Sequence, residues 1–297
     1  MGQSLLFLAT LAWGTSFFIL KDTIEKTPAF FVLALRFLFA GAVFCLVFYK
    51  KLKKLNKSTF FKGVILGVIL FLAYVAQTEG LKLHSPGKNA FLTATYCVMC
   101  PFLLWIMFKI KPTLQNVVSA LLCIIGVGLV ALSGDSGKGS NVLLGDGLTL
   151  IGAVFFSLQI IAIDKFQKSG ADSILLLIFE LLTVGVLCAV STLIFELPSV
   201  EINAYALSGE QILKIGYLAV ACTLFAQFAQ IFGQKFTTPN QSAIILSLEA
   251  VFGVLFSVLF AGEILTLMIV IGFVAIFIAI LYSEVKIDFK KLIKRKK

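Results

Sequence analysis

The sequence predicts an all-α polytopic membrane protein whose ten transmembrane helices form two inverted five-helix repeats. Hydrophobic residues make up 60% of the 297 residues and charged residues only 13%, which is too little charge to cover the surface of a soluble domain of this size. The apolar residues occur in long blocks, and a helix needs about 20 of them to cross a bilayer. In addition, the second half of the chain repeats part of the first.

The apolar blocks define the expected spans, and most connections between them are short and carry turn residues such as Lys111-Pro112. The first five spans are 4–20, 29–49, 63–81, 89–108 and 113–132, and the second five are 147–163, 174–195, 215–233, 240–260 and 265–283. The two longest connections, Ser133 to Asp146 and Glu196 to Lys214, are too short to form a separate domain. We therefore expect one repeat at 1–134, a second at 145–284 and a basic tail at 285–297.

The distribution of positive charge predicts the orientation. Lysine and arginine are enriched in cytoplasmic connections, and 18 of them lie on one side of the expected membrane against six on the other. The richer side holds the loop after the second span and the tail, so we expect a multi-pass protein of the cell (plasma) membrane with both termini cytoplasmic. This placement accounts for the net charge of +10 without a nucleic-acid partner, because no soluble basic surface is expected.

An internal repeat relates the two halves. A shift of 153 residues places the segment from Gly63 to Pro86 on the segment from Gly216 to Pro239 without a gap. Eight identities then fall within the 28 positions from Gly63 to Ala90, and the paired residues include Gln77 with Gln230. Each half has five spans, and an odd number of spans reverses the direction of the second copy. Inverted repeats of this kind are typical of secondary transporters, whose substrate site lies near mid-membrane between the repeats.

Several motifs resemble the EamA repeat of the drug/metabolite transporter superfamily. In the first half they are Trp13-Gly14-Thr15-Ser16-Phe17, Arg36-Phe37, the run from Leu81 to Pro101, and Lys109-Ile110-Lys111-Pro112 followed by Ile124 to Leu132. In the second half they are Leu248-Glu249-Ala250-Val251-Phe252 and Gly262-Glu263. Ala250 replaces the proline that is usual there, and the first half lacks the Gly-Glu pair. The resemblance covers nearly the whole chain and implies a ten-helix, exporter-like carrier. It implies little about the substrate, because members of the superfamily handle diverse solutes.

Charged side chains inside the spans are the first candidates for function. A charge at the centre of a membrane helix costs at least ~2.5–3.5 kcal/mol, so it usually faces the bundle interior and has a partner. We assign charge or proton coupling to Glu180, Arg36, Glu249 and Glu79. The alternative for each is a structural or interfacial ion pair. Glu263 lies at a span end, where a helix-end or loop contact is the simpler interpretation.

Uncharged polar side chains form a second group of candidates. Tyr74 and Gln77 lie on one face of the third span, and Gln227, Gln230 and Gln234 lie on one face of the eighth. A two-fold axis between the repeats would bring both stripes to one central cavity. We predict substrate binding by these residues together with Trp13, Tyr96 and Gln159. Amides that only hold helices together, and tryptophans that only anchor at the interface, are the alternatives.

These observations predict a secondary transporter, an exporter of a small polar or amphipathic metabolite such as an amino acid, that works by alternating access between the repeats. A passive facilitator or channel is the alternative. An intramembrane enzyme is disfavoured, because the one histidine, His84, lies in a connection and no metal-binding or nucleophile–base motif appears. We expect no cofactor and no metal. The expected partners are a small-molecule substrate and the lipid bilayer, and a homodimer remains open.

Overall fold

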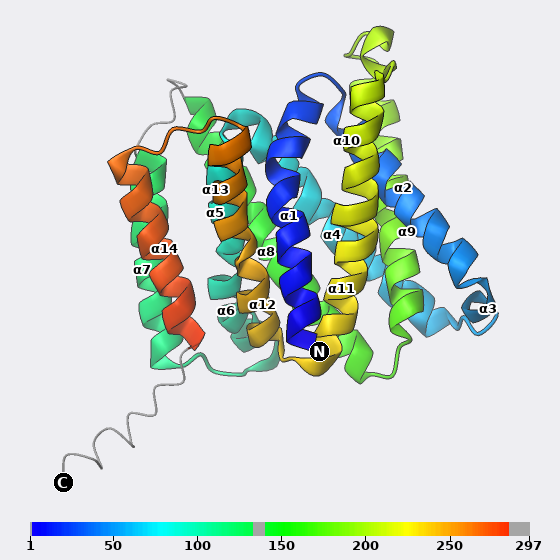
Figure 1. Cartoon of the computed structure of the whole chain (residues 1–297). Coiled ribbons are helices and arrows are strands. Elements are labelled where there is room, and N and C mark those ends of the chain that lie inside the picture. The colour runs from blue at the N-terminus through cyan, green and yellow to red at the C-terminus, as the bar shows by residue number, and fades with distance from the viewer. Residues whose placement is uncertain (1, 133–139, 285–297) are drawn as a thin grey trace.

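The structure, a computed structural model, describes residues 2–132 and 140–284 as a bundle of helices (Figure 1). Within these residues no strand occurs. The first half contains α1 (Gly2–Ile24), α2 (Ala29–Val47), α3 (Tyr49–Leu52), α4 (Lys57–Leu83), α5 (Pro86–Ala94), α6 (Tyr96–Phe108) and α7 (Leu114–Leu132). The second half contains α8 (Ser140–Lys168), α9 (Ser173–Ser191), α10 (Gly209–Ala219), α11 (Ala226–Gly233), α12 (Pro239–Ser247), α13 (Glu249–Phe260) and α14 (Leu267–Glu284).

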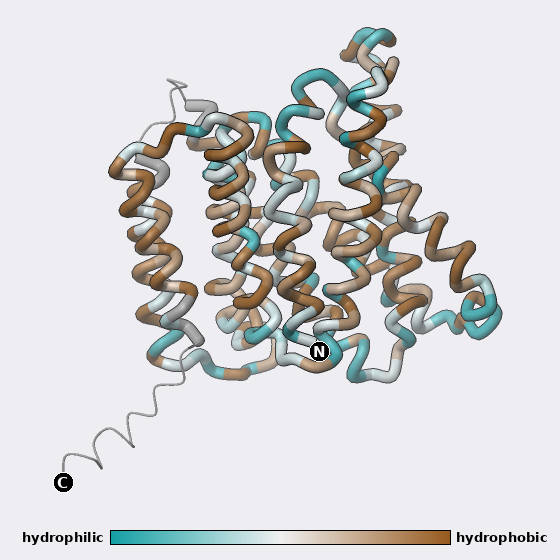
Figure 2. The backbone as a smooth tube through the Cα atoms, viewed as in Figure 1, coloured by the Kyte–Doolittle hydropathy of each residue, from teal (hydrophilic) through white to brown (hydrophobic). Residues whose placement is uncertain are grey.

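The helices have the length and composition of membrane spans. Eight continuous helical stretches among the described residues are long and apolar enough to cross a bilayer, and α7 and α14 add the shorter apolar segments Leu114–Leu129 and Leu267–Ile280. Figure 2 shows the hydrophobic residues along the middle of the bundle and the hydrophilic ones gathered toward its two ends. Side chains such as Leu46, Ile106 and Leu193 are exposed on the outside, as expected where lipid is the solvent. The predicted class, an all-helical multi-pass membrane protein, is confirmed.

Several helices begin before the apolar block that predicted them. α4 begins at Lys57 because the Asn56 side chain caps it by accepting from the Thr59 backbone N–H. α10 begins at Gly209 because Ser208 and Gln211 form a capping box. α8 begins at Ser140, so the expected connection up to Asp146 is partly helical. Helix caps, and not hydropathy, thus set the starts of α4 and α10. The rest of that connection, 133–139, and the expected tail at 285–297 lie outside the described residues.

Close backbone contact joins α4 of the first half to α8 of the second. A Cβ atom on Gly80 would lie 2.2 Å from Thr149 Oγ1 and 2.8 Å from the Gly145 carbonyl oxygen. A Cβ on Gly152 would lie 3.1 Å from the Ala73 carbonyl oxygen. Small residues let helices approach in this way where the bilayer provides no hydrophobic driving force. The α4–α8 contact therefore forms a tightly packed centre to the bundle.

Three spans are interrupted near mid-length. Thr95 separates α5 from α6, and Leu248 separates α12 from α13. A hydroxyl donates to the carbonyl three residues earlier at both places, Thr95 to Leu92 and Ser247 to Ile244, which competes with the helical hydrogen bonds. Between α10 and α11 the chain forms a π-helical segment, Val220–Phe225. Irregular backbone at membrane depth is tolerated where it is buried in protein or lines a cavity.

Candidate functional site

A buried cavity of about 30 Å³ lies among the interrupted helices. Its lining comes from α1, α4, α6, α8, α11, α12 and α13, and so from both halves of the chain. The lining residues are Trp13, Ser16, Phe17, Leu70, Tyr74, Gln77, Tyr96, Phe156, Gln159, Ile160, Gln227, Gln230, Leu246 and Glu249. The volume holds a water molecule or two and is far below the ~300–1,000 Å³ of ordinary ligand pockets. We call this the central cavity; in this conformation it is too small to hold a metabolite, and we refer to this as the closed state.

Eight of the side chains that the sequence singled out line the central cavity: Trp13, Tyr74, Gln77, Tyr96, Gln159, Gln227, Gln230 and Glu249. The side chain of Tyr74 lies next to that of Gln227, and the side chain of Tyr96 lies next to that of Glu249. Both contacts cross from the first half to the second. Tyr96 and Glu249 directly follow the breaks at Thr95 and Leu248, so the breaks deliver these two groups to the cavity.

Glu180 lies behind the cavity wall in an amide–carboxyl chain. It is fully buried, and its Oε1 accepts from Gln159 Nε2 at 2.8 Å. Gln159 in turn accepts from Gln230 Nε2 at 2.9 Å. The second carboxyl oxygen, Glu180 Oε2, has no hydrogen-bond partner in the structure. A carboxyl group with one free oxygen at this depth is suited to gain and lose a proton, because burial disfavours a bare charge.

Arg36 lies behind another wall of the cavity, next to Tyr74. It is 1% exposed, and its guanidinium carbon lies 5.4 Å from the centre of the Tyr74 ring and 5.4 Å from that of Phe37. Its Nε donates to Thr223 Oγ1 at 2.7 Å, and its Nη2 donates to the Cys222 carbonyl at 3.4 Å. Arg36 is therefore hydrogen-bonded to the π-helical segment between α10 and α11.

The remaining candidates lie away from the central cavity. Gln234 donates to the Ile160 carbonyl at 3.2 Å and joins two helices. Glu79 is one-third exposed and pairs with Lys82 at 2.6 Å. Glu263 accepts from Ser85 Oγ, from the Gly87 backbone N–H and from Ser257 Oγ. It is thus a loop contact that caps the start of α5.

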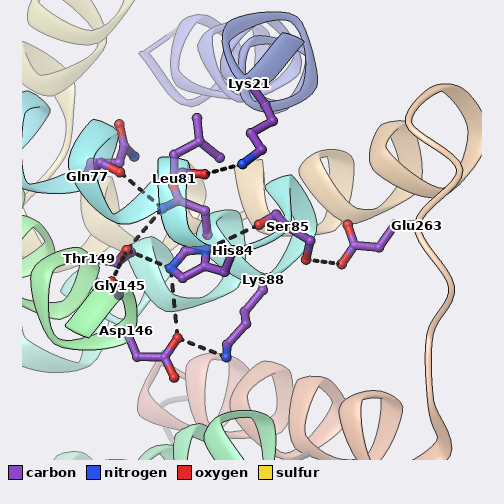
Figure 3. Close-up of polar contacts among 11 residues, drawn as sticks. Lys21, Gln77, Leu81, His84, Ser85, Lys88, Gly145, Asp146, Thr149 and Glu263 are labelled. Atoms are coloured by element: carbon purple, nitrogen blue, oxygen red, sulfur yellow. Dashed lines mark hydrogen bonds and ion pairs between the residues drawn. The ribbon is translucent and has the colours of Figure 1, made fainter. Parts of the chain in front are cut away.

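Sequence reasoning missed a buried charged cluster where α4, α5 and α8 meet (Figure 3). Lys88 Nζ lies 2.9 Å from Asp146 Oδ1, and His84 Nε2 lies 3.8 Å from the same oxygen and 3.2 Å from Thr149 Oγ1. Asn89 donates to Thr149 as well. Burial lowers the pKa of His84 below its ordinary value, an effect that Asp146 opposes and Lys88 reinforces. The one feature of the sequence that could have indicated this cluster is that Lys88 and Asp146 lie at the edges of expected spans.

A second cavity, of about 580 Å³, lies beside this cluster. His84, Lys21, Asp22 and Lys214 are among its lining residues. We call it the distal vestibule, because it lies at the end of the bundle where α1 ends, opposite the face that carries the N-terminus and the end of α14 (Figure 1). Phe18 lines the vestibule and its neighbour Phe17 lines the central cavity, so the two cavities follow one another along α1.

The apolar members of the central cavity, such as Phe17, Phe156 and Leu246, were also missed. In a membrane protein such residues cover every surface, so sequence alone offers no sign of which ones face a cavity. Within the described ranges no group of three or more histidine, cysteine or acidic side chains is arranged to hold a metal ion.

Interrupted helices around a buried polar cavity at membrane depth are typical of membrane transporters. The EamA-like transporter family matches this chain twice, at residues 1–132 and 143–283. An uncharacterized transporter from Archaeoglobus fulgidus is 31% identical over 282 residues, which is 95% of this chain and 85% of that protein. The chain therefore belongs to the EamA-like transporter family, and it is a membrane transporter rather than an enzyme.

A solved crystal structure of a protein has a similar fold. It covers 100% of this chain and 98% of its own, with a TM-score of 0.70. At 18% identity this similarity supports the fold alone.

Proposed function

We propose that this protein is a secondary transporter that exports a small polar or amphipathic metabolite, such as an amino acid, by alternating access. Ten spans would form two inverted repeats, 1–134 and 145–284, and these would move about the central cavity. Both termini would face the cytoplasm at the cell membrane, and the distal vestibule would then open to the outside. The positive-inside distribution of lysine and arginine supports this orientation.

Helix boundaries support the repeat. A shift of 153 residues brings α5 and α6 onto α12 and α13, and α7 onto α14, with ends that agree to within about one residue. The same shift brings α4 onto the helical stretch Gly209–Phe236. The second helices, α2 and α9, match end for end at a shift of 144 residues, which is 173 minus 29. The difference falls in the connection after the second helix of each half.

The observation that carries the proposal is that equivalent residues touch each other. At the shift of 153, Tyr96 corresponds to Glu249 and Tyr74 to Gln227, and the two side chains of each pair lie next to each other. Two positions related by a two-fold axis can be in contact only near that axis. The axis of the proposed inverted repeat would therefore pass through the central cavity, where secondary transporters bind their substrates.

The closed centre favours a carrier over a passive channel. A channel needs a continuous path for solute, whereas a carrier passes through a state closed at its centre. The central cavity of about 30 Å³ beside a distal vestibule of about 580 Å³ fits the second case.

Counterflow in liposomes tests the proposal. Solutes that shift the melting temperature of the purified protein would be loaded inside vesicles, and uptake of a labelled trace from outside would be followed. A carrier gives transient accumulation of the trace that saturates with solute concentration. Uptake that stays linear with concentration and shows no accumulation would favour a channel and contradict alternating access.

A further inference from the structure

Arg36 is a buried cation whose counter-ion is missing from the described part of the chain. The hydrogen bonds of its guanidinium go to the neutral Thr223 hydroxyl and the Cys222 carbonyl. Its third nitrogen, Nη1, is buried and has no hydrogen-bond partner, and no ion pair in the described residues includes Arg36. Arginine keeps its charge in proteins. A charge of this kind inside a membrane protein usually has a partner.

The surroundings compensate this charge only in part. The rings of Tyr74 and Phe37 offer cation–π contacts at 5.4 Å, and such contacts are weaker than an ion pair. Neither buried carboxyl of the site is paired with Arg36 in the described residues: Glu180 Oε1 accepts from Gln159, and Glu249 lies next to Tyr96. A carboxyl group can also become neutral on burial, whereas the guanidinium cannot.

Arg36 is separated from the central cavity by one layer of side chains. Tyr74 lies over its guanidinium and also lines the cavity. Trp13, another lining residue, donates to the same Cys222 carbonyl at 2.9 Å, so Arg36 and Trp13 share one acceptor. That carbonyl belongs to a π-helical segment, and such segments occur frequently at functional sites. Tyr74 is therefore the side chain that lies between Arg36 and a solute in the cavity.

We propose that the transported solute carries an anionic group, a carboxylate in the simplest case, and that Arg36 is its counter-ion in the loaded state. The inference rests on the proposed carrier function and names the chemical class of its substrate. A guanidinium matches a carboxylate through parallel N–H···O bonds. In the closed state Arg36 is held by Thr223 and the rings, and Nη1 is left for the solute.

Matched pairs of probes test this inference on the purified full-length protein. The pairs differ only at one group: L-leucine and L-leucinamide, L-phenylalanine and L-phenylalaninamide, propionate and propionamide, benzoate and benzamide. Binding would be measured by calorimetry and by the shift in melting temperature. We expect the acids to bind at least about tenfold more tightly than their amides, as the loss of a charge-assisted hydrogen bond requires.

Variants then assign the effect to Arg36. Arg36→Gln should remove the preference for the acid, and Arg36→Lys, which keeps the charge without the planar fork, should retain part of it. Thr223→Val is the matched control, since it deletes a partner of Arg36 and leaves the guanidinium. Thr223→Val should keep the preference for the acid. If the Arg36 variants fail to fold, the wild-type protein and Thr223→Val, measured with the matched probes, still test the proposal.

The outcomes separate the two proposals. Amides that bind as tightly as the matched acids, or a folded Arg36→Gln protein that retains the preference, would overturn the anionic class and leave the carrier function standing. A wild-type protein that binds no member of the panel would count against a carrier of such metabolites, and this inference would fall with it.

Discussion

At the scale of single residues, Gln77 and Gln230 occupy equivalent positions but have different partners. Gln77 Nε2 donates to Thr93 Oγ1 at 3.0 Å within its own half. Gln230 donates to Gln159, which holds Glu180. Both amides line the central cavity, so both can contact a solute, but only Gln230 also supports a buried carboxyl.

This difference leads to a first prediction. Gln77→Leu and Gln230→Leu should each weaken solute binding several-fold, because one hydrogen bond contributes about 0.5–1.5 kcal/mol. Gln230→Leu should also lower the melting temperature, since it leaves Gln159 Oε1 buried without a donor. Calorimetric titration and thermal unfolding of both variants would check this. If the melting temperature falls in both while affinity is unchanged, the amides belong to the scaffold and not to the site.

The second prediction concerns coupling through Glu180, whose Oε2 is unpartnered. If this carboxyl carries the proton that drives transport, Glu180→Gln should abolish uptake driven by a pH gradient and spare exchange of solute for solute. Glu249→Gln tests the other buried carboxyl in the same way. Glu79→Gln is the control, because Glu79 pairs with Lys82 outside the cavity. Full pH-driven transport in both buried variants would show that another ion, or the solute gradient alone, drives the cycle.

At the scale of elements, the close contact between α4 and α8, which we call the seam, has a different role from the helices that are interrupted at Thr95 and Leu248. The seam brings backbone against backbone at Gly80 and Gly152, so it resists sliding. The breaks at Thr95 and Leu248 instead turn Tyr96 and Glu249 to the cavity. We expect the seam to stay closed through the cycle while the broken helices change shape.

Glycine substitutions test the seam. Gly80→Ala would place a Cβ 2.2 Å from Thr149 Oγ1 and 2.8 Å from a backbone oxygen, a contact that only a backbone shift relieves. It should therefore destabilise the protein by roughly 1–3 kcal/mol, as overpacking does. Gly147→Ala is the matched control on α8, because nothing lies within 4 Å of the added carbon. Thermal unfolding in detergent would compare them; equal melting temperatures would mean that the seam is loosely packed.

At the scale of the whole molecule, the two ends of the described chain lie on one face (Figure 1). The basic loop around α3 and the distal vestibule lie at opposite ends of the bundle, because α4 crosses from Lys57 to Leu83 between them. If the lysine-rich side faces the cytoplasm, as we propose from the positive-inside rule, the vestibule opens to the outside of the cell.

Single cysteines test this orientation. Cysteines at Ser58 and Lys168 should react with a membrane-impermeant maleimide only from the cytoplasmic side. A cysteine at Ser208, the cap of α10, should react only from outside. Inside-out and right-side-out vesicles provide the two conditions, and a cysteine-free parent is the control. If the cysteines introduced at Ser58 and Ser208 were labelled from the same side, that result would contradict the ten-span topology.

The helices of this protein and their order were predictable from hydropathy and turn residues. A helix satisfies all its backbone hydrogen bonds within one segment, as a membrane requires, so each apolar block implies one helix without knowledge of the others. The polar stripes of α4 and α11 were predictable for the same local reason, because their spacing is that of one helical face. The helix starts that follow Asn56 and Ser208 were less predictable, because these capping residues, and not apolar residues, set them.

Contacts between distant segments depended on tertiary structure. His84, Lys88 and Asp146 come from three helices or their ends, and each appears in the sequence as an ordinary residue at a span edge. The π-helical segment that holds Arg36 and Trp13 has no signature in its sequence, Val220–Phe225. Whether a buried charge has a partner depends on how helices pack, because the groups that meet are far apart in the sequence: Arg36 and Thr223 are separated by 187 residues.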